Sequence, residues 1–353
     1  MSDETQEEKR FGVKRWIVIA LIAIGIYVSF MGPTFLRPIT PVVVLPPEPT
    51  GLAIGNFQIT NTILATLLAD LVLLLMAYGA WRFSKKGGLV PQGFYNAFEA
   101  IVEFLWNSVS GSAGTKWAKR MFPIVATIFL LVFTANMVKL VPGFEAIGQL
   151  KEMHLPGTAY EPKHLFDIGS LGVYSLDKGK PHEVVAIHGE EDAGHGEEAA
   201  VADEEHGSDA LCTECEVVPF LRGSATDLNF PFALAFIAVF MTQVFGVWAL
   251  GLGYFEKFFP IKQVIHGGIF GGINFAVGIL EIVLEFAKIL SFGFRLFGNI
   301  FAGALLLSII GVLTAVGLPA GLYLFEIFFG AIQAYVFFLL ATVFISGALE
   351  SHH

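Results

Sequence analysis

Charged residues are scarce in this chain, and their scarcity already excludes most classes of protein. Only 15% of the 353 residues are Asp, Glu, Lys or Arg, whereas 55% are hydrophobic, and the mean hydropathy is +0.68. Soluble domains carry about 25% charged residues, so a water-soluble globular protein is excluded. The composition indicates a polytopic membrane protein. We expect no nucleic-acid partner.

Several functional patterns are also missing. The sequence contains no Gly-x-x-x-x-Gly-Lys-Ser/Thr phosphate loop of its own. We find no internal repeat, which removes support for an inverted-repeat transporter plan. The apolar segments offer no plausible nucleophile and base for an intramembrane hydrolase. We therefore expect a protein that is not an enzyme and that carries no cofactor.

Cysteine is nearly absent, with two residues in the stretch Cys212-Thr-Glu-Cys215. Together with His195 or His206 they are compatible with a zinc site, but a second Cys-x-x-Cys pair is lacking. A disulfide in an oxidising compartment is the second alternative, and two free thiols are the third. We favour the free thiols and expect no metal site.

The net charge of −10 comes from one segment of the chain. Residues 142–228 contain 18 of the 31 acidic residues, 5 of the 21 basic residues and 6 of the 9 histidines. Within this segment, residues 189–209 are rich in Glu, Asp, Gly and Ala and poor in large apolar residues, which predicts local disorder. We expect a solvated insertion, and the alternative is an acidic cap that concentrates cations at the mouth of an ion path.

The apolar residues gather in six segments that we interpret as membrane spans of roughly 20 residues each. The first follows four basic residues but lacks a clear small-x-small cleavage site, so we expect a retained signal anchor, with a cleaved signal peptide as the alternative. Residues 94–109 have apolar side chains at helical spacing, which predicts an interfacial amphipathic helix. The six segments are residues 16–32, 59–83, 121–141, 229–254, 275–313 and 318–349.

These segments predict an all-α membrane protein with about six transmembrane helices and one interfacial helix. Basic residues flank them on one side of the membrane if every segment crosses once, and that side is the cytoplasm. Both termini are then cytoplasmic, and the acidic insertion is external. We divide the chain into an N-terminal region with the signal anchor and a Pro-rich external connector, a pair of spans around the interfacial helix, the acidic insertion, and a helical channel region. The four regions are residues 1–58, 59–141, 142–228 and 229–353.

The fifth apolar segment carries a polar stripe, whose members fall within about 80° of one another on a helix. Lys288 is within helical reach of Glu285 and of Glu281, so internal ion pairing is the plain interpretation of those three residues. Arg295 has no acid within a helical turn, and an intramembrane Arg without a local partner predicts a functional site. The stripe consists of Glu281, Glu285, Lys288, Arg295 and Asn299.

The same segment is too long for one perpendicular crossing. As a helix it would reach about 58 Å, near double the ~30 Å of a hydrocarbon core. We expect either a break near Gly293 or Gly298 or a steep tilt.

The last apolar segment adds Glu326 and Gln333, which lie seven residues apart on one helical face. Packed antiparallel to its predecessor, it would bring them near Arg295 and Asn299, as a proton relay requires. An interhelical hydrogen bond is the plain alternative for Gln333.

Two further ionisable residues lie in earlier apolar segments. Asp70 stands in mid-segment and needs a partner that the sequence does not identify. Lys139 stands near a segment end, where we expect it to reach toward the membrane surface.

Residues 291–303, Ser-Phe-Gly-Phe-Arg-Leu-Phe-Gly-Asn-Ile-Phe-Ala-Gly, resemble subunit a of the rotary F-type ATP synthase. The stretch 281–288 and the sequence Gln-Ala-Tyr-Val-Phe from Gln333 support the resemblance. Weaker landmarks are residues 136–142 and 226–229. The likeness covers about residues 57–349, apart from the acidic insertion.

The resemblance implies a stator whose two long, steeply tilted C-terminal helices curve along a rotating ring of c subunits. Two aqueous half-channels would end at the ring. Arg295 would separate them and promote deprotonation of the ring carboxylate, so that proton flow turns the ring and drives ATP synthesis in a separate soluble sector. Other implied partners are peripheral-stalk b subunits, further ATP synthase subunits and the lipid bilayer, in a bacterial inner membrane. The residues implied along the proton path are Glu281, Glu285, Glu326, Gln333 and Asn299.

The sequence departs from its relatives at three positions. Relatives often carry an acid at the positions of Ala304 and Lys139 and a His at that of Glu326, which puts a role for position 304 in doubt. We expect H⁺ as the coupling ion. The alternative from another class is a self-contained secondary transporter whose buried Arg binds an anionic substrate, and it predicts transport by the purified chain alone.

Overall fold

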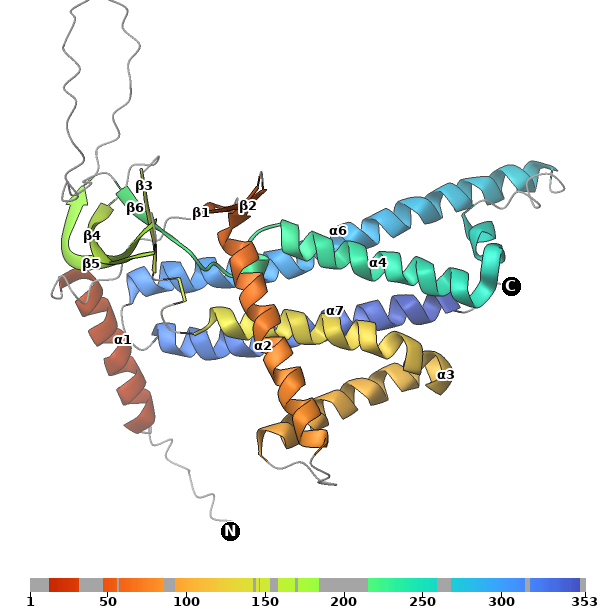
Figure 1. The fold of residues 1–353 in the computed structure, drawn as a ribbon, viewed down its shortest axis with the longest axis horizontal. Helices are drawn as coiled ribbons and strands as arrows, with labels where there is room; N and C mark the ends of the chain where they lie inside the picture. The colour runs from red at the N-terminus through yellow and green to blue at the C-terminus, as the bar shows by residue number, and fades with distance from the viewer. Residues whose placement is uncertain are drawn as a thin grey trace, which may run out of the picture. The chain divides into compact units, whose positions relative to one another are not determined.

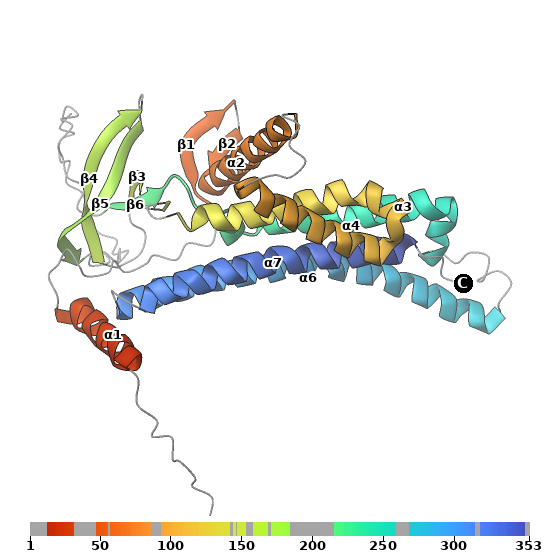
Figure 2. The same cartoon turned by 90° about the horizontal axis from the view of Figure 1, so that it is seen from below.

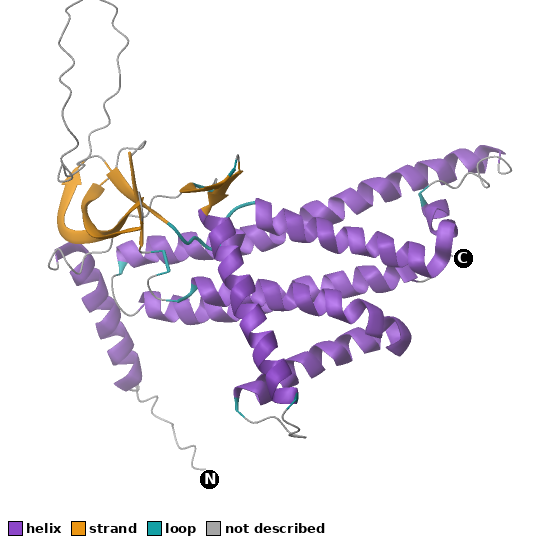
Figure 3. Cartoon of the chain, viewed as in Figure 1, coloured by secondary structure: helices purple, strands orange, loops and turns teal. Residues whose placement is uncertain are grey.

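A computed structural model describes eleven stretches of the chain, and most of their residues are helical (Figure 1, Figure 3). The stretches are residues 13–31, 47–55, 57–85, 93–141, 144–145, 147–152, 158–168, 171–183, 215–258, 268–314 and 318–349. The helices are α1 (Val13–Met31), α2 (Asn61–Ser84), α3 (Phe94–Lys139), α4 (Asn229–Leu250), α6 (Gly268–Leu313) and α7 (Leu318–Leu349), with 3-10 turns η2 (Ser224–Thr226) and η3 (Gly251–Lys257).

Helices α2, α3, α4, α6 and α7 are long and apolar enough to cross a membrane. The apolar stretch of α1, Arg15–Val28, is shorter than these five. Large apolar side chains such as Leu74 on α2 and Phe286 on α6 are each 67% exposed, as lipid-facing residues are. The predicted all-α membrane architecture is confirmed for the helical part of the chain.

The chain forms two compact units, which we describe separately. The first comprises residues 1–43, 145–221 and 306–322, and the second comprises residues 44–144, 222–305 and 323–353.

The first unit contains a four-stranded antiparallel sheet that the sequence analysis missed. Its strands lie in the order β4-β5-β3-β6. Part of the acidic insertion is thus ordered by backbone pairing, while residues 189–209, where we predicted disorder, lie outside the described residues. The strands are β3 (Ile147–Glu152), β4 (Thr158–Ile168), β5 (Leu171–Glu183) and β6 (Cys215–Pro219).

The second unit begins with a small hairpin of β1 (Pro49–Ile54) and β2 (Phe57–Thr60), which leads directly into α2. The start of α2 is tied to the start of α4 by one buried carboxylate. Asp227 accepts a hydrogen bond of 2.6 Å from the Thr62 hydroxyl and another of 2.9 Å from the backbone N–H of Asn229. The family landmark at residues 226–229 therefore contains a carboxylate that caps the start of α4 and joins it to α2.

Helix α3 joins two segments that we predicted separately, the interfacial helix 94–109 and the span 121–141. The two halves meet at Gly114, whose φ of 69° and ψ of 157° break the helical path. This conformation is essentially restricted to glycine. Gly114 therefore supplies a bend between the two parts, which we predicted as separate elements.

Helix α6 is continuous from Gly268 to Leu313. The predicted alternative of a break near Gly293 or Gly298 is therefore wrong. A helix of 46 residues is about 69 Å long, so it fits the hydrocarbon core only if it is steeply tilted or extends well beyond it.

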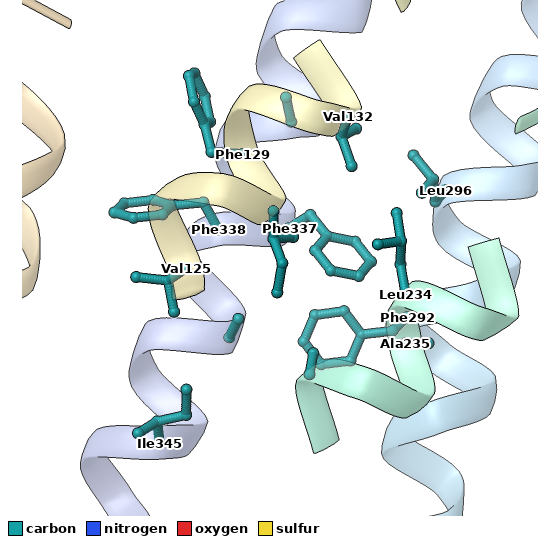
Figure 4. Packing of buried hydrophobic residues seen from close by; sticks show 14 of the residues in the cluster. Val125, Phe129, Val132, Leu234, Ala235, Phe292, Leu296, Phe337, Phe338 and Ile345 are labelled. Atoms are coloured by element: carbon teal, nitrogen blue, oxygen red, sulfur yellow. The ribbon is translucent and has the colours of Figure 1, made fainter. Parts of the chain in front are cut away.

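The core of the second unit lies where α3, α4, α6 and α7 meet (Figure 4). Phe337 and Phe338 on α7 and Leu296 on α6 are essentially fully buried. Small residues such as Ala235 and Ala334 are 0% exposed and let the backbones approach. In lipid, close packing of this kind, more than exclusion of water, holds helices together.

Within the second unit, α6 and α7 run side by side in opposite directions (Figure 2). The Phe292 ring contacts the rings of Phe337 and Phe344, at centroid distances of 4.8 and 5.4 Å. This register decides which polar residues of the two helices face each other.

Candidate functional site

Arg295 lies in the middle of α6 on the exposed side of the helix. Its neighbours Phe292 and Leu296 are 2% and 0% exposed and point into the core, whereas Phe294 beside it is 55% exposed. Arg295 forms no hydrogen bond, ion pair or ring contact with any described residue. A permanently charged guanidinium therefore stands on an apolar, outward-facing helix surface.

A first polar cluster, which we call the Lys257 cluster, lies before Arg295 along α6. Lys257 of η3 forms ion pairs with Glu281 at 2.5 Å and with Glu285 at 3.2 Å, and Lys288 pairs with Glu285 at 2.8 Å. The predicted pairing of Glu285 with Lys288 is confirmed. Glu281 pairs with Lys257 and not with Lys288, a partner that the sequence analysis missed because it lies outside the helix.

Lys257 is the centre of this cluster, and its two acidic partners favour its protonated form. Burial alone lowers the pKa of Lys257, but its hydrogen bonds to Glu281 and Glu285 outweigh burial and raise the pKa above its ordinary value. The second carboxylate oxygen of Glu285, Oε2, is buried and has no hydrogen-bond partner among the described residues.

A second polar cluster, the Glu326 cluster, lies beyond Arg295 along α6. Glu326 of α7 forms an ion pair with Lys139 of α3, and its carboxylate lies next to Gly303 of α6. Asn136, one turn before Lys139, donates a hydrogen bond of 3.3 Å to the carbonyl of Gly330.

Lys139 was expected to reach toward the membrane surface, and this prediction is wrong. Its side chain is only 7% exposed and is held by Glu326, whose side chain is 13% exposed. A buried ammonium requires such a partner, since burial without one is costly. No sequence pattern indicated this pairing, because the two residues are 187 positions apart.

Asn299 and Gln333 join the two helices between Arg295 and Glu326. The Asn299 side-chain amide donates a 3.4 Å hydrogen bond to the Gln333 carbonyl, as the antiparallel hairpin predicted. The Gln333 amide nitrogen, Nε2, is buried and finds no hydrogen-bond partner in the part of the chain that the structure describes. Figure 4 shows the packed core that lies beside this contact, around Leu296 and Phe337.

The remaining candidates lie elsewhere. Asp70 on α2 is half-buried and forms no hydrogen bond or ion pair with another described residue. His195, His206 and Cys212 lie outside the described residues, so the zinc and disulfide alternatives remain untested. The described part of the chain contains no group of three or more His, Cys, Asp or Glu placed to hold a metal ion.

Taken from one end of α6 to the other, the site has three parts. The Lys257 cluster and the Glu326 cluster each contain a largely shielded acid paired with a lysine from another element. Arg295 stands between them along the helix, exposed and unpaired within the described residues. Two proton-binding groups separated by a fixed positive charge can pass ions to a mobile partner while preventing direct flow between them.

Comparison with known proteins identifies the family. The family model described as ATP synthase A chain matches residues 63–346. ATP synthase subunit a of Mycobacterium bovis is 26% identical over 312 residues, 86% of this chain and 94% of the relative. The subunit a of Helicobacter pylori is 24% identical over 302 residues, 84% of this chain and 94% of the relative. The sodium ion specific subunit a of Propionigenium modestum is 25% identical over 297 residues, 83% of this chain and 75% of the relative. Because the family model covers most of its length, this chain belongs to the ATP synthase A chain family.

Proposed function

We propose that this chain is the stator of a proton-driven rotary ATP synthase and that Arg295 separates two proton paths to a ring of c subunits. Family membership makes it a non-catalytic, ion-translocating membrane subunit of the ATP synthase. The observation that carries the mechanism is the position of Arg295, exposed on α6 between two acid-containing clusters.

In this mechanism, the exposed face of α6 meets the ring. The Arg295 guanidinium attracts the ring carboxylate and favours its ionised form, so the carboxylate gives up its proton as it passes. Because a guanidinium does not deprotonate in proteins, Arg295 cannot itself carry protons from one path to the other. Proton flow between the paths then requires the ring to turn.

The two clusters divide the proton path between the two sides of the membrane. In this proposal the Lys257 cluster faces the cytoplasm together with both termini, an orientation supported by the basic residues that flank the helices. Glu281 and Glu285 would then line the cytoplasmic path. Glu326, with Gln333 and Asn299, would line the external path and deliver protons to the ring.

The proposal includes the partners and the location that this role requires. Besides the c-subunit ring, these are peripheral-stalk b subunits, the other ATP synthase subunits and the lipid of a bacterial inner membrane. H⁺ is proposed as the coupling ion. A Na⁺ gradient that drives ATP synthesis in proteoliposomes at zero pH difference would contradict this choice.

The decisive experiment is Arg295→Ala in membranes that contain the complete complex. We expect proton-driven ATP synthesis to fall by about two orders of magnitude or more, with the complex still assembled. Arg82→Ala is the matched control, because Arg82 is an exposed arginine on α2. Normal coupled synthesis by the Arg295→Ala complex would overturn the proposal.

The transporter alternative makes a separate prediction. It requires an arginine enclosed in a binding pocket, whereas Arg295 is exposed on the helix surface. Anion uptake by the purified chain alone in liposomes would support the transporter, and we expect none.

A further inference from the structure

Lys139 is the last residue of α3, and its ammonium reaches inward to a carboxylate of another helix. The ion pair with Glu326 is largely shielded, with side chains 7% and 13% exposed. Separating the two charges would leave each of them buried without a partner, which is strongly unfavourable. The pair is therefore the resting arrangement of these two residues as long as Glu326 is ionised, and not a passing surface contact.

The surrounding helices are shaped to hold this pair. A Cβ at Gly303 of α6 would lie 3.6 Å from Glu326 Oε1, an ordinary contact distance, so the carboxylate packs directly against α6. A Cβ at Gly330 of α7 would lie 3.2 Å from the Cβ of Asn136, so α3 and α7 approach closely one turn away. The hydrogen bond from Asn136 to Gly330 fixes their register. Three helices thus meet at the Lys139–Glu326 pair.

Other charged and titratable groups lie on the elements that pack around the pair. The segment before α4 packs on Lys139 through Gly223 and carries Arg222 and Asp227. Asp227 is occupied by Thr62 and by the first N–H groups of α4. On α7, Tyr323 lies about one turn from Glu326, and on α6 Arg295 lies about two turns from Gly303.

We propose that Lys139 is a positioning residue of the external proton path, one that competes with the incoming proton for the Glu326 carboxylate. This inference rests on the proposed function. The proton comes from water, binds Glu326 and breaks the ion pair, and the pair forms again when the proton passes to the ring carboxylate. The charge of Lys139 thereby sets the external pH at which Glu326 binds its proton.

The test compares three variants in the complete complex in proteoliposomes. ATP synthesis is measured against external pH, with the total driving force held constant by the membrane potential. Lys139→Met removes the competing charge, so we expect the pH of half-maximal synthesis to move to higher pH by about one unit. Lys139→Arg keeps the charge and should restore the wild-type profile. Lys119→Met, an exposed lysine on the same helix, should also leave the profile unchanged.

An unshifted profile in assembled Lys139→Met complex would overturn the inference, as would a shift that Lys139→Arg does not reverse. If Lys139→Met fails to assemble, Lys139→Gln provides the same readout, because it removes the charge while keeping a hydrogen-bond donor. Arg295→Ala measured in parallel separates the two proposals. Loss of synthesis in Arg295→Ala with an unshifted Lys139→Met profile would remove only the role of Lys139, whereas normal synthesis in Arg295→Ala would remove the proposed function.

Discussion

The charged residues described on α6 and α7 all form ion pairs, with one exception. Glu281, Glu285 and Lys288 on α6 and Glu326 on α7 all take part in ion pairs. Arg295, the fifth charged residue described on these helices, has no partner among the described residues. Because unpaired charge in a membrane is costly, Arg295 needs a partner, and the proposed function supplies one in the ring carboxylate.

The sequence could identify Arg295 but could not identify the lysines that complete the two clusters. Arg295 stood out because helical periodicity shows that no acid lies within one turn. Lys139 and Lys257 are held by acids on other helices, and helical spacing carries no information about such contacts. For the same reason Gln333 could be placed near Asn299 only after an antiparallel hairpin was assumed.

Alkaline pH should loosen the Lys257 cluster. The pKa of Lys257 is raised on folding because its bonds to Glu281 and Glu285 outweigh the effect of burial. Burial also raises the pKa of Tyr254, whose phenol donates a 2.8 Å hydrogen bond to Gln243. A raised pKa stabilises the fold fully below the group's ordinary value and loses this effect as the pH rises through the folded-state value.

We therefore expect the melting temperature of the detergent-solubilised chain, followed by circular dichroism, to fall as the pH rises above about 10. Lys257→Met should melt at lower temperature than wild type at pH 8, and the difference should shrink at the alkaline end. Lys119→Met is the control and should follow the wild-type curve. A difference between Lys257→Met and wild type that is constant from pH 8 to 11 would contradict this explanation.

At the scale of elements, the apolar segments of the sequence predicted the presence of the long helices well and the residues at which they begin and end poorly. The long block of residues 275–313 became one helix, but α6 begins seven residues earlier, at Gly268. The glycine-rich stretch before residue 275 weakens the hydropathy signal without preventing helix formation. The bend in α3 could not be predicted from the sequence either, because glycine is compatible with both a straight and a bent helix.

Gly114 should be the most sensitive glycine of α3. At φ 69° and ψ 157°, a side chain strains the backbone, so Gly114→Ala should cost about 1–3 kcal/mol. Gly111 is the matched control: its conformation is ordinary, and a Cβ there meets nothing within 4 Å. Gly111→Ala should be neutral or stabilising by about 0.5–1 kcal/mol. Thermal melting of the purified variants measures both, and equal effects at the two positions would refute the role of Gly114.

At the scale of the whole molecule, the excess acid and the membrane-embedded helices occupy different parts of the sequence. The net charge of −10 arises from residues 142–228, which contain 18 of the 31 acidic residues. Four strands of this segment pair with one another in the first unit. Their pairing joins residues that are far apart in the sequence. The segment lacks the regular alternation of apolar and polar residues that would have predicted strands.

The insertion provides the last prediction, the effect of deleting residues 189–209. The deletion removes nine acidic residues and no basic ones. The ten residues left between β5 and β6 can span up to ~33 Å. The strand β6 begins opposite Glu152 of β3, whereas β5 pairs with β3 at Ile147 and Gly148 and continues beyond Ile147 to Glu183. The two ends to be joined therefore lie toward opposite ends of β3, and assembly of the deletion variant is checked first. If the insertion is only solvated surface, proton-driven ATP synthesis should keep its pH and salt dependence.

An acidic cap would behave differently, because the field of exposed charges reaches about 10 Å at 0.1 M salt and three times farther at 0.01 M. It would raise the local proton concentration chiefly at low ionic strength. Deletion would then slow synthesis at 0.01 M salt and have little effect at 0.1 M. A full-length variant with the nine acids of residues 189–209 replaced by Asn and Gln separates charge from chain length. We expect the deletion and this neutral variant to match wild type at both salt concentrations, and a loss confined to low salt in both would instead establish the cap.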